Sequence, residues 1–179
     1  MHILHDISDS RIAPEDFIVL IEIQKGSSKK CEIDKETGLL IYDRKLRTSN
    51  HYPANYGFIP RTLGGDNDPI DVFVIFSNQI PPMTLIECFP VGVIHMQDND
   101  ESDEKILAVP FCDPLYKDIK DVSELPQYLV NEIVHFLTVY KQLEGKGKDK
   151  VAVGSVEGRE RAIELIKQAK KNYLKKFGK

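Results

Sequence analysis

One stretch indicates the fold of this 179-residue chain better than any other: Gly64-Gly65-Asp66-Asn67-Asp68-Pro69-Ile70-Asp71-Val72-Phe73-Val74. It sets three carboxylates between two glycines and an apolar strand. Carboxylates this close repel one another, and water or hard cations between them relieve the repulsion. An Asx-rich surface turn is the simpler interpretation of Asp66 and Asp68. Asp71 argues against it, because its neighbours look buried and a charge there requires a metal or a cationic partner.

Around this stretch the chain reads as short strands separated by turn residues, from about Asp16 to Pro110, and then as helix. This order of elements predicts an α+β fold. Alternation along residues 30–34 places Lys30 and Glu32 on one face and Cys31 and Ile33 on the other. The expected strands are Phe17–Gln24, Lys30–Asp34, Leu39–Leu46, Ile70–Phe76 and Thr84–Met96.

Two helices are expected in the C-terminal third. Ser123 is a suitable cap with Pro126 in the first turn, and apolar residues then recur at helical spacing until Gly145, which predicts about five turns. A second helix is expected from near Gly158 to Tyr173. The residues between the helices, 146–157, are interpreted as a loop.

Composition narrows the possible functions. The chain has 24 Lys and Arg against 28 Asp and Glu, a net charge of -4, which argues against a main role in binding duplex nucleic acid. Cys31, Cys88 and Cys112 are widely spaced and predict neither a disulfide framework nor a zinc site. The first residues lack a basic region followed by an apolar run, and no stretch approaches the roughly 20 apolar residues of a membrane span. We therefore expect one cytoplasmic domain over residues 1–179.

A second acidic stretch, Asp98-Asn99-Asp100-Glu101-Ser102-Asp103-Glu104-Lys105, lies beside a predicted strand. On its own it is typical of a solvated hairpin tip. Neither acidic stretch is an EF-hand loop: the sixth positions are Asp71 and Asp103 where glycine is needed, and the twelfth are Ser77 and Val109 where glutamate is needed.

Cations occur within the ordered elements and not in a tail. Lys30, Arg44, Lys105 and Lys141 offer donors to phosphate oxygens, and a tyrosine hydroxyl such as Tyr56 or Tyr140 offers a neutral donor. Any one of them is more simply a surface ion pair or a half-buried tyrosine. Carboxylates and phosphate-binding cations together indicate metal-assisted phosphoryl transfer.

With these residues placed, the chain resembles the family I soluble inorganic pyrophosphatases of the bacterial type, over about Pro14 to Tyr173. The family signature is an Asp-x-Asp-Pro-hydrophobic-Asp-hydrophobic run, met by residues 66–72. It is joined in order by Val19–Ile23, Lys30–Gly38, Asp43-Arg44, Tyr52–Pro60, Pro90–Val93, Asp98–Val109, His135-Phe136 and Tyr140-Lys141. The resemblance implies a five-stranded, OB-like barrel flanked by helices, and a homohexamer.

The resemblance also implies the reaction and its residues. Pyrophosphate is hydrolysed to two phosphates by a water or hydroxide bound to Mg²⁺, and Asp68 matches the general base. The metal ligands fall on Asp66, Asp71 and Asp103, on Asp98 together with Asp103, and on Glu22 and Glu32 as the rest of an acidic wall. The phosphate-binding residues fall on Lys30, Arg44, Tyr56, Lys105, Tyr140 and Lys141.

One departure concerns assembly. Val139 stands where bacterial relatives commonly carry a histidine, which leaves only His135 on this helix for subunit contacts.

Two other functions fit the sequence less well. A non-catalytic OB-like module that binds phosphate or single-stranded nucleic acid would need a basic groove, whereas this groove is acidic. A nucleotide-dependent enzyme would need a Walker A loop, and residues 145–149 do not form one because Asp149 stands where Ser or Thr is required.

Overall fold

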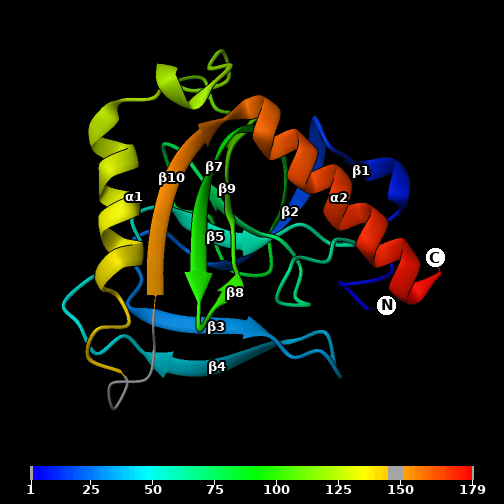
Figure 1. The fold of residues 1–179 in the computed structure, drawn as a ribbon, viewed down its shortest axis with the longest axis horizontal. Coiled ribbons are helices and arrows are strands. Elements are labelled where there is room, and N and C mark those ends of the chain that lie inside the picture. The colour runs from blue at the N-terminus through cyan, green and yellow to red at the C-terminus, as the bar shows by residue number, and fades with distance from the viewer. Residues whose placement is uncertain (1, 145–150, 179) are drawn as a thin grey trace.

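A ring of five strands forms the centre of the protein in the computed structural model, which describes residues 2–144 and 151–178. The ring runs β2 (Asp16–Ile23), β5 (Asn55–Phe58), β6 (Asp71–Val74), β9 (Lys105–Pro110) and β7 (Leu85–Asp98), and it closes where β7 pairs with β2. Its neighbours are antiparallel except β6 and β9, which are parallel. The predicted α+β class and five-stranded barrel are confirmed (Figure 1).

Close approach of β2 and β5 depends on a glycine. A Cβ on Gly57 would lie 1.8 Å from the carbonyl oxygen of Leu20, so only glycine fits. The register between the strands shifts between Ile21 and Ile23, and a bulge of this kind bends a strand as barrel closure requires.

Shorter elements extend the ring. β1 (Ile12–Ala13) follows a 3₁₀ turn, η1 (Asp9–Arg11), and pairs with β2, while β8 (Glu101–Ser102) pairs with β7 as a hairpin. β10 (Val151–Gly158) also pairs with β7. The expectation of a loop over residues 151–157 is therefore wrong, and the part of it at 146–150 lies outside the described residues. Gly154 and a register shift between Val153 and Val156 interrupt the alternation that would have indicated a strand.

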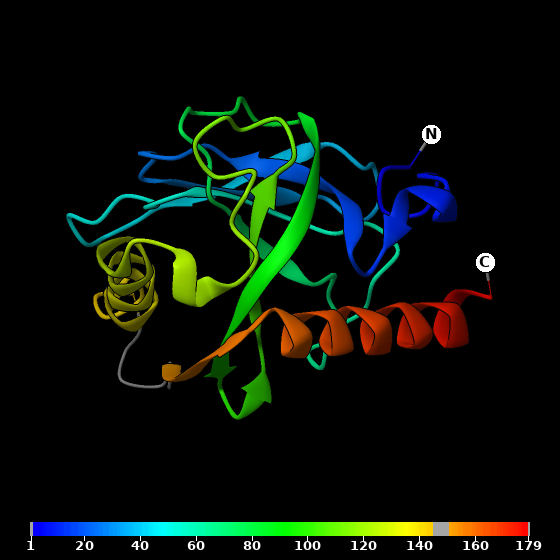
Figure 2. The same ribbon diagram turned by 90° about the horizontal axis from the view of Figure 1, so that it is seen from above.

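Two helices pack against the barrel, as expected. α2 (Arg159–Phe177) buries Ala162, Ile166, Ala169 and Tyr173 and ends at Gly178, whose φ of 65° is left-handed. Figure 2 shows α2 along one side of the barrel and α1 (Gln127–Val139) beside its other end. Neither described helix is long and apolar enough to span a bilayer.

The boundaries of the first helix differ from the expectation. α1 has 13 residues, not five turns, because residues after Val139 form separate turns in which Glu144 N donates to Lys141 O at 3.0 Å. Ser123 is not its cap. It lies in a 3₁₀ turn, η2 (Val122–Glu124), whose cap is Asp121, and α1 starts after Pro126 without a side-chain cap.

A separate two-stranded sheet faces one end of the barrel. Its strands are β3 (Lys29–Ile33) and β4 (Leu40–Lys45), joined by a turn in which Gly38 has a φ of 72°. Lys30 stands opposite Arg44 in this hairpin. In Figure 1 the hairpin lies beneath the barrel.

Candidate active site

A cavity of about 530 Å³ lies between the barrel and the β3–β4 hairpin. Every site residue predicted from the sequence lines it, except Arg44. The predicted residues in its wall are Glu22, Lys30, Glu32, Tyr56, Asp66, Asp68, Asp71, Asp98, Asp103, Lys105, Tyr140 and Lys141. Residues more than a hundred positions apart therefore meet at one surface.

The acidic loop is shaped by its own side chains. Asp66 Oδ1 accepts a hydrogen bond from Asp68 N at 3.0 Å, an Asx turn, and Gly64 N donates to Asp68 O at 2.7 Å. Asn67 takes a left-handed φ of 65°, which asparagine tolerates better than most residues. The turn holds Asp66 and Asp68 at the cavity just before β6 begins at Asp71.

Lys105 is the central cation of the site. Its side chain is 4% exposed, and Nζ lies 2.6 Å from a carboxylate oxygen of Asp71 and 2.6 Å from one of Asp103. Burial disfavours the charge of Lys105, but the two aspartates outweigh burial and raise its pKa. The expected cationic partner of Asp71 is thus present, within the set already predicted for phosphate.

Several acids in the wall have raised pKa values, because burial and neighbouring carboxylates disfavour their charged forms. Burial and the nearby charge of Asp71 raise the pKa of Glu22 to about 8, although Glu22 Oε1 accepts a hydrogen bond from Ile33 N at 2.8 Å. Burial, with Asp103 and Asp71 adding repulsion, raises the pKa of Asp66 to about 6. The pKa of Asp103 is raised too, mainly by burial. A cation placed among these groups would relieve both effects.

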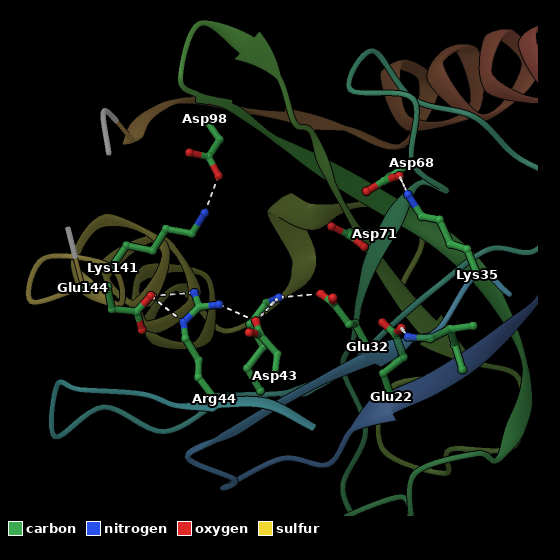
Figure 3. A network of polar contacts seen from close by, with 12 residues as sticks. Glu22, Glu32, Lys35, Asp43, Arg44, Asp68, Asp71, Asp98, Lys141 and Glu144 are labelled. Atoms are coloured by element: carbon green, nitrogen blue, oxygen red, sulfur yellow. Dashed lines mark hydrogen bonds and ion pairs between the residues drawn. The ribbon is translucent and has the colours of Figure 1, made fainter. Parts of the chain in front are cut away.

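Lysines from other elements reach across to the acids. Figure 3 shows Lys35 in an ion pair with Asp68 on one side of the site and Lys141 in an ion pair with Asp98 on the other, with Glu22, Glu32 and Asp71 between them. Lys30 Nζ contacts Glu32 at 2.8 Å and Asp43 at 2.9 Å. The wall thus carries both positive and negative side chains. It can therefore attract both a cation and an anion such as phosphate.

An aromatic layer supports the back of the cavity. Tyr52 packs against Tyr56 and Phe136, with ring centroids 5.4 and 4.7 Å apart, and Phe136 stacks on Tyr140. Burial raises the pKa of Tyr56 and of Tyr140, so both hydroxyls stay protonated near neutral pH. They can therefore donate hydrogen bonds to an anion.

Carboxylate oxygens are the donors that hard cations such as Mg²⁺ prefer. Among residues 2–144 and 151–178, no three His, Cys, Asp or Glu side chains are grouped so that they could hold a metal ion. Asp71 and Asp103 are paired with Lys105, and Asp98 with Lys141. The chemistry of the wall nevertheless fits Mg²⁺, since its acids are numerous, share one cavity and repel one another.

Three residues that pair with the predicted site residues were not assigned a role from the sequence. Asp43 Oδ2 binds both Lys30 and Arg44, which stand opposite each other on β3 and β4. Lys35 and Glu144 are the others, and each pairs with a predicted site residue. Asp43 could have been suspected, because it adjoins Arg44 in the sequence.

Comparisons with known proteins show the family of this chain. A family model described as inorganic pyrophosphatase matches residues 19–174. The chain belongs to this family. An inorganic pyrophosphatase of Aquifex pyrophilus is 45% identical over 177 residues, covering 97% of this chain and 98% of the relative. The soluble inorganic pyrophosphatase 1 of Arabidopsis thaliana is 45% identical over 165 residues, covering 92% of this chain and 76% of the relative.

Solved inorganic pyrophosphatases share the fold. The Thermus thermophilus structure has a TM-score of 0.90 at 33% identity, covering 96% of this chain and 98% of that one. The Helicobacter pylori structure has a TM-score of 0.86 at 38% identity, covering 90% and 95%. These matches confirm the resemblance to family I soluble inorganic pyrophosphatases, and bacterial proteins are among the relatives. They also confirm the OB-like barrel.

Proposed function

We propose that this inorganic pyrophosphatase hydrolyses pyrophosphate to two phosphates with Mg²⁺ as its cofactor, in the cavity between the barrel and the β3–β4 hairpin. One observation carries the proposal: the predicted acids and the predicted cations, Arg44 excepted, line the same cavity. A nucleic-acid groove would be lined mainly by cations, and this one is not.

The acidic wall would hold the metal. Asp66, Asp71 and Asp103 are assigned to the tightest site, Asp98 and Asp103 to a second, and Glu22 and Glu32 to the remaining wall. Bound Mg²⁺ lowers the pKa of its water and so supplies a nucleophile near neutral pH. Lys105 pairs with Asp71 and Asp103, and Lys141 pairs with Asp98, so these carboxylates would have to leave the lysines to hold a metal. The freed ammonium groups could then bind the substrate phosphates.

Asp68 is assigned as the general base. Its side chain is 50% exposed at the cavity, so water can reach it, and the Asx turn with Asp66 holds its backbone in place. It would accept the proton of the attacking water, and no covalent intermediate on the protein is needed. Lys35 pairs with Asp68 and would have to release it.

Cations and hydroxyls would hold the phosphates. Lys30 and Lys141 reach the cavity from the hairpin and from the turn after α1, while Lys105 lies at its base. Tyr56 and Tyr140 would donate neutral hydrogen bonds. Together with Arg44, these donors would neutralise charge on the leaving phosphate as it develops.

We further propose a single cytoplasmic domain that assembles as a homohexamer, as the resemblance implies. His135 on α1 is the remaining histidine for the subunit contact. Sedimentation velocity at several protein concentrations would measure the assembly.

The direct test of the function is phosphate release from pyrophosphate by the purified protein. We expect fast release with Mg²⁺ that stops on addition of a chelator and returns with excess Mg²⁺. A folded, metal-supplied protein that releases no phosphate would contradict the proposal. Tight, Mg²⁺-independent binding of a single-stranded oligonucleotide would then favour the binding module.

A further inference from the structure

Arg44 differs from every other predicted phosphate-binding residue, because its side chain does not line the cavity. Its guanidinium is turned toward Glu144, in the turn that follows α1. Arg44 Nε donates to Glu144 Oε2 at 2.6 Å, and Nη2 contacts the same oxygen at 2.5 Å. The third nitrogen, Nη1, donates to Asp43. In Figure 3 this pair lies apart from Asp68 and Asp71, on the side of the site where Lys141 lies.

The contact with Glu144 uses a particular edge of Arg44. The Nε and Nη2 hydrogens point in parallel, and this is an edge with which arginine binds carboxylate or phosphate through two bonds. While Glu144 occupies this edge, Arg44 can offer a phosphate only the remaining hydrogens of Nη1 and Nη2. A two-bond contact between phosphate and the Nε edge of Arg44 requires that the ion pair with Glu144 break first.

The buried position of Glu144 is energetically unfavourable for its carboxylate. Its side chain is 8% exposed, and within the described part of the chain its Oε1 is buried without a hydrogen-bond partner. A buried carboxylate is unfavourable unless it is paired, and Arg44 is the only cation that the described residues bring to it. A pair of this kind contributes little net stability, so stability alone does not account for it.

Glu144 lies close in the chain to a predicted phosphate-binding residue, Lys141. Glu144 N donates to the carbonyl oxygen of Lys141 at 3.0 Å, so Glu144 belongs to the same turn as a predicted phosphate-binding lysine. Arg44 comes from the hairpin on the opposite side of the cavity. The ion pair thus joins the two sides at the edge of the cavity where Lys141 and Lys30 would meet a phosphate.

We propose that Glu144 is a positioning residue that competes with the phosphate of substrate or product for the guanidinium of Arg44, and so weakens phosphate binding. This inference rests on the proposed function, because it needs Arg44 to bind phosphate. A competing acid keeps the product from being held too tightly, since Glu144 takes Arg44 back as phosphate leaves.

The test replaces Glu144 by glutamine, which keeps the shape but removes the charge that holds Arg44. We expect the KM for pyrophosphate and the Kd for inorganic phosphate, measured by calorimetry with Mg²⁺, to fall about three- to tenfold. Glu160→Gln, an exposed site on α2, makes the same charge change away from the cavity and should alter neither constant. A residue that only stabilises the fold would change the unfolding midpoint and leave both constants as they are.

A double-mutant cycle with Arg44→Ala decides whether Glu144 acts through Arg44. Arg44→Ala should raise the Kd for phosphate, and in that background Glu144→Gln should have no further effect. Unchanged or weaker phosphate binding in Glu144→Gln alone, or an equal gain without Arg44, would overturn the inference.

Wild-type turnover in the same preparation separates this inference from the proposed function. If the wild-type protein hydrolyses pyrophosphate and Arg44→Ala weakens phosphate binding while Glu144→Gln changes nothing, only the inference fails. If the wild-type protein releases no phosphate, the proposed function fails, and the calorimetric comparison still tests Glu144.

Discussion

Lys105 is the register partner of Asp71 across the parallel strands β9 and β6, and its ammonium lies 2.6 Å from the carboxylate of that residue. Both residues belong to the barrel wall, so the pairing of the two strands itself brings a buried cation to the acidic stretch. A parallel pair is the exception in this ring. The topology of the barrel therefore places the charge at the base of the cavity.

Replacing Lys105 by methionine tests this relationship. Removing one partner of a buried ion pair leaves uncompensated charge, so we expect a loss of about 3 kcal/mol in the free energy of unfolding without Mg²⁺. Added Mg²⁺ should recover more stability in this variant than in the wild type, because a bound cation can replace the missing ammonium. Urea denaturation with and without Mg²⁺ measures both, and Lys171→Met on the exposed face of α2 is the control.

Asp68→Asn should separate catalysis from folding. Asparagine keeps the shape of the side chain but cannot take a proton from water, so we expect kcat to fall by about 100-fold or more. The side chain is 50% exposed, so the free energy of unfolding should change little. Asp118→Asn, an exposed site outside the cavity, is the matched control. Wild-type turnover in the Asp68 variant would refute its role as the base.

Asp121 links the start of α2 to η2 through one carboxylate. It accepts hydrogen bonds from Arg159 N at 2.9 Å and Ser123 N at 3.0 Å. Gly158 gives it room, because a Cβ there would lie 2.5 Å from Asp121 Oδ1. We expect Asp121→Ala to cost about 1–2 kcal/mol at neutral pH, as the loss of a helix cap does. Thermal or urea unfolding measures this loss.

The same residue predicts a pH dependence. The hydrogen bond from Arg159 N, followed by those from Ser123, lowers the pKa of Asp121 in the folded protein. A lowered folded pKa contributes stability above the unfolded value of about 4 and loses it as the pH falls further. The difference in the free energy of unfolding between the wild type and Asp121→Ala should therefore become smaller below about pH 4. This difference should remain modest, since Asp121 is partly solvated.

Asn55, at the start of β5, joins two loops through one buried amide. Its Oδ1 accepts from Lys25 N at 3.0 Å and from Ile80 N at 2.9 Å, and its Nδ2 donates to Asn78 O at 3.0 Å. Asn55→Leu should cost about 2–4 kcal/mol, because it leaves these three backbone groups without their partner. Asn131→Leu on the exposed face of α1 should cost far less. Equal losses in the two variants would contradict this role for Asn55.

Strands that alternate or are strongly apolar could be predicted from the sequence. β2, β3, β4, β6 and β7 were predicted with every boundary off by one or two residues. β5 went unpredicted because it has only four residues and includes glycine. β9 went unpredicted because it starts with the charged Lys105 and ends with proline. The loop predicted where β10 lies was wrong, because a bulge breaks the alternation on which a strand prediction depends.

Local sequence by itself determined the class of the fold, the two C-terminal helices and the Asx turn at Asp66 and Asp68, since these depend on residues close along the chain. Family resemblance supplied the set of site residues. Only the tertiary structure decided which charges meet: that Lys105 binds Asp71 and Asp103, that Asp43 lies between Lys30 and Arg44, and that Arg44 turns from the cavity to Glu144. Electrostatic pairing depends on distance in space and on burial, and both are set by how the barrel, the β3–β4 hairpin and the turn after α1 pack together.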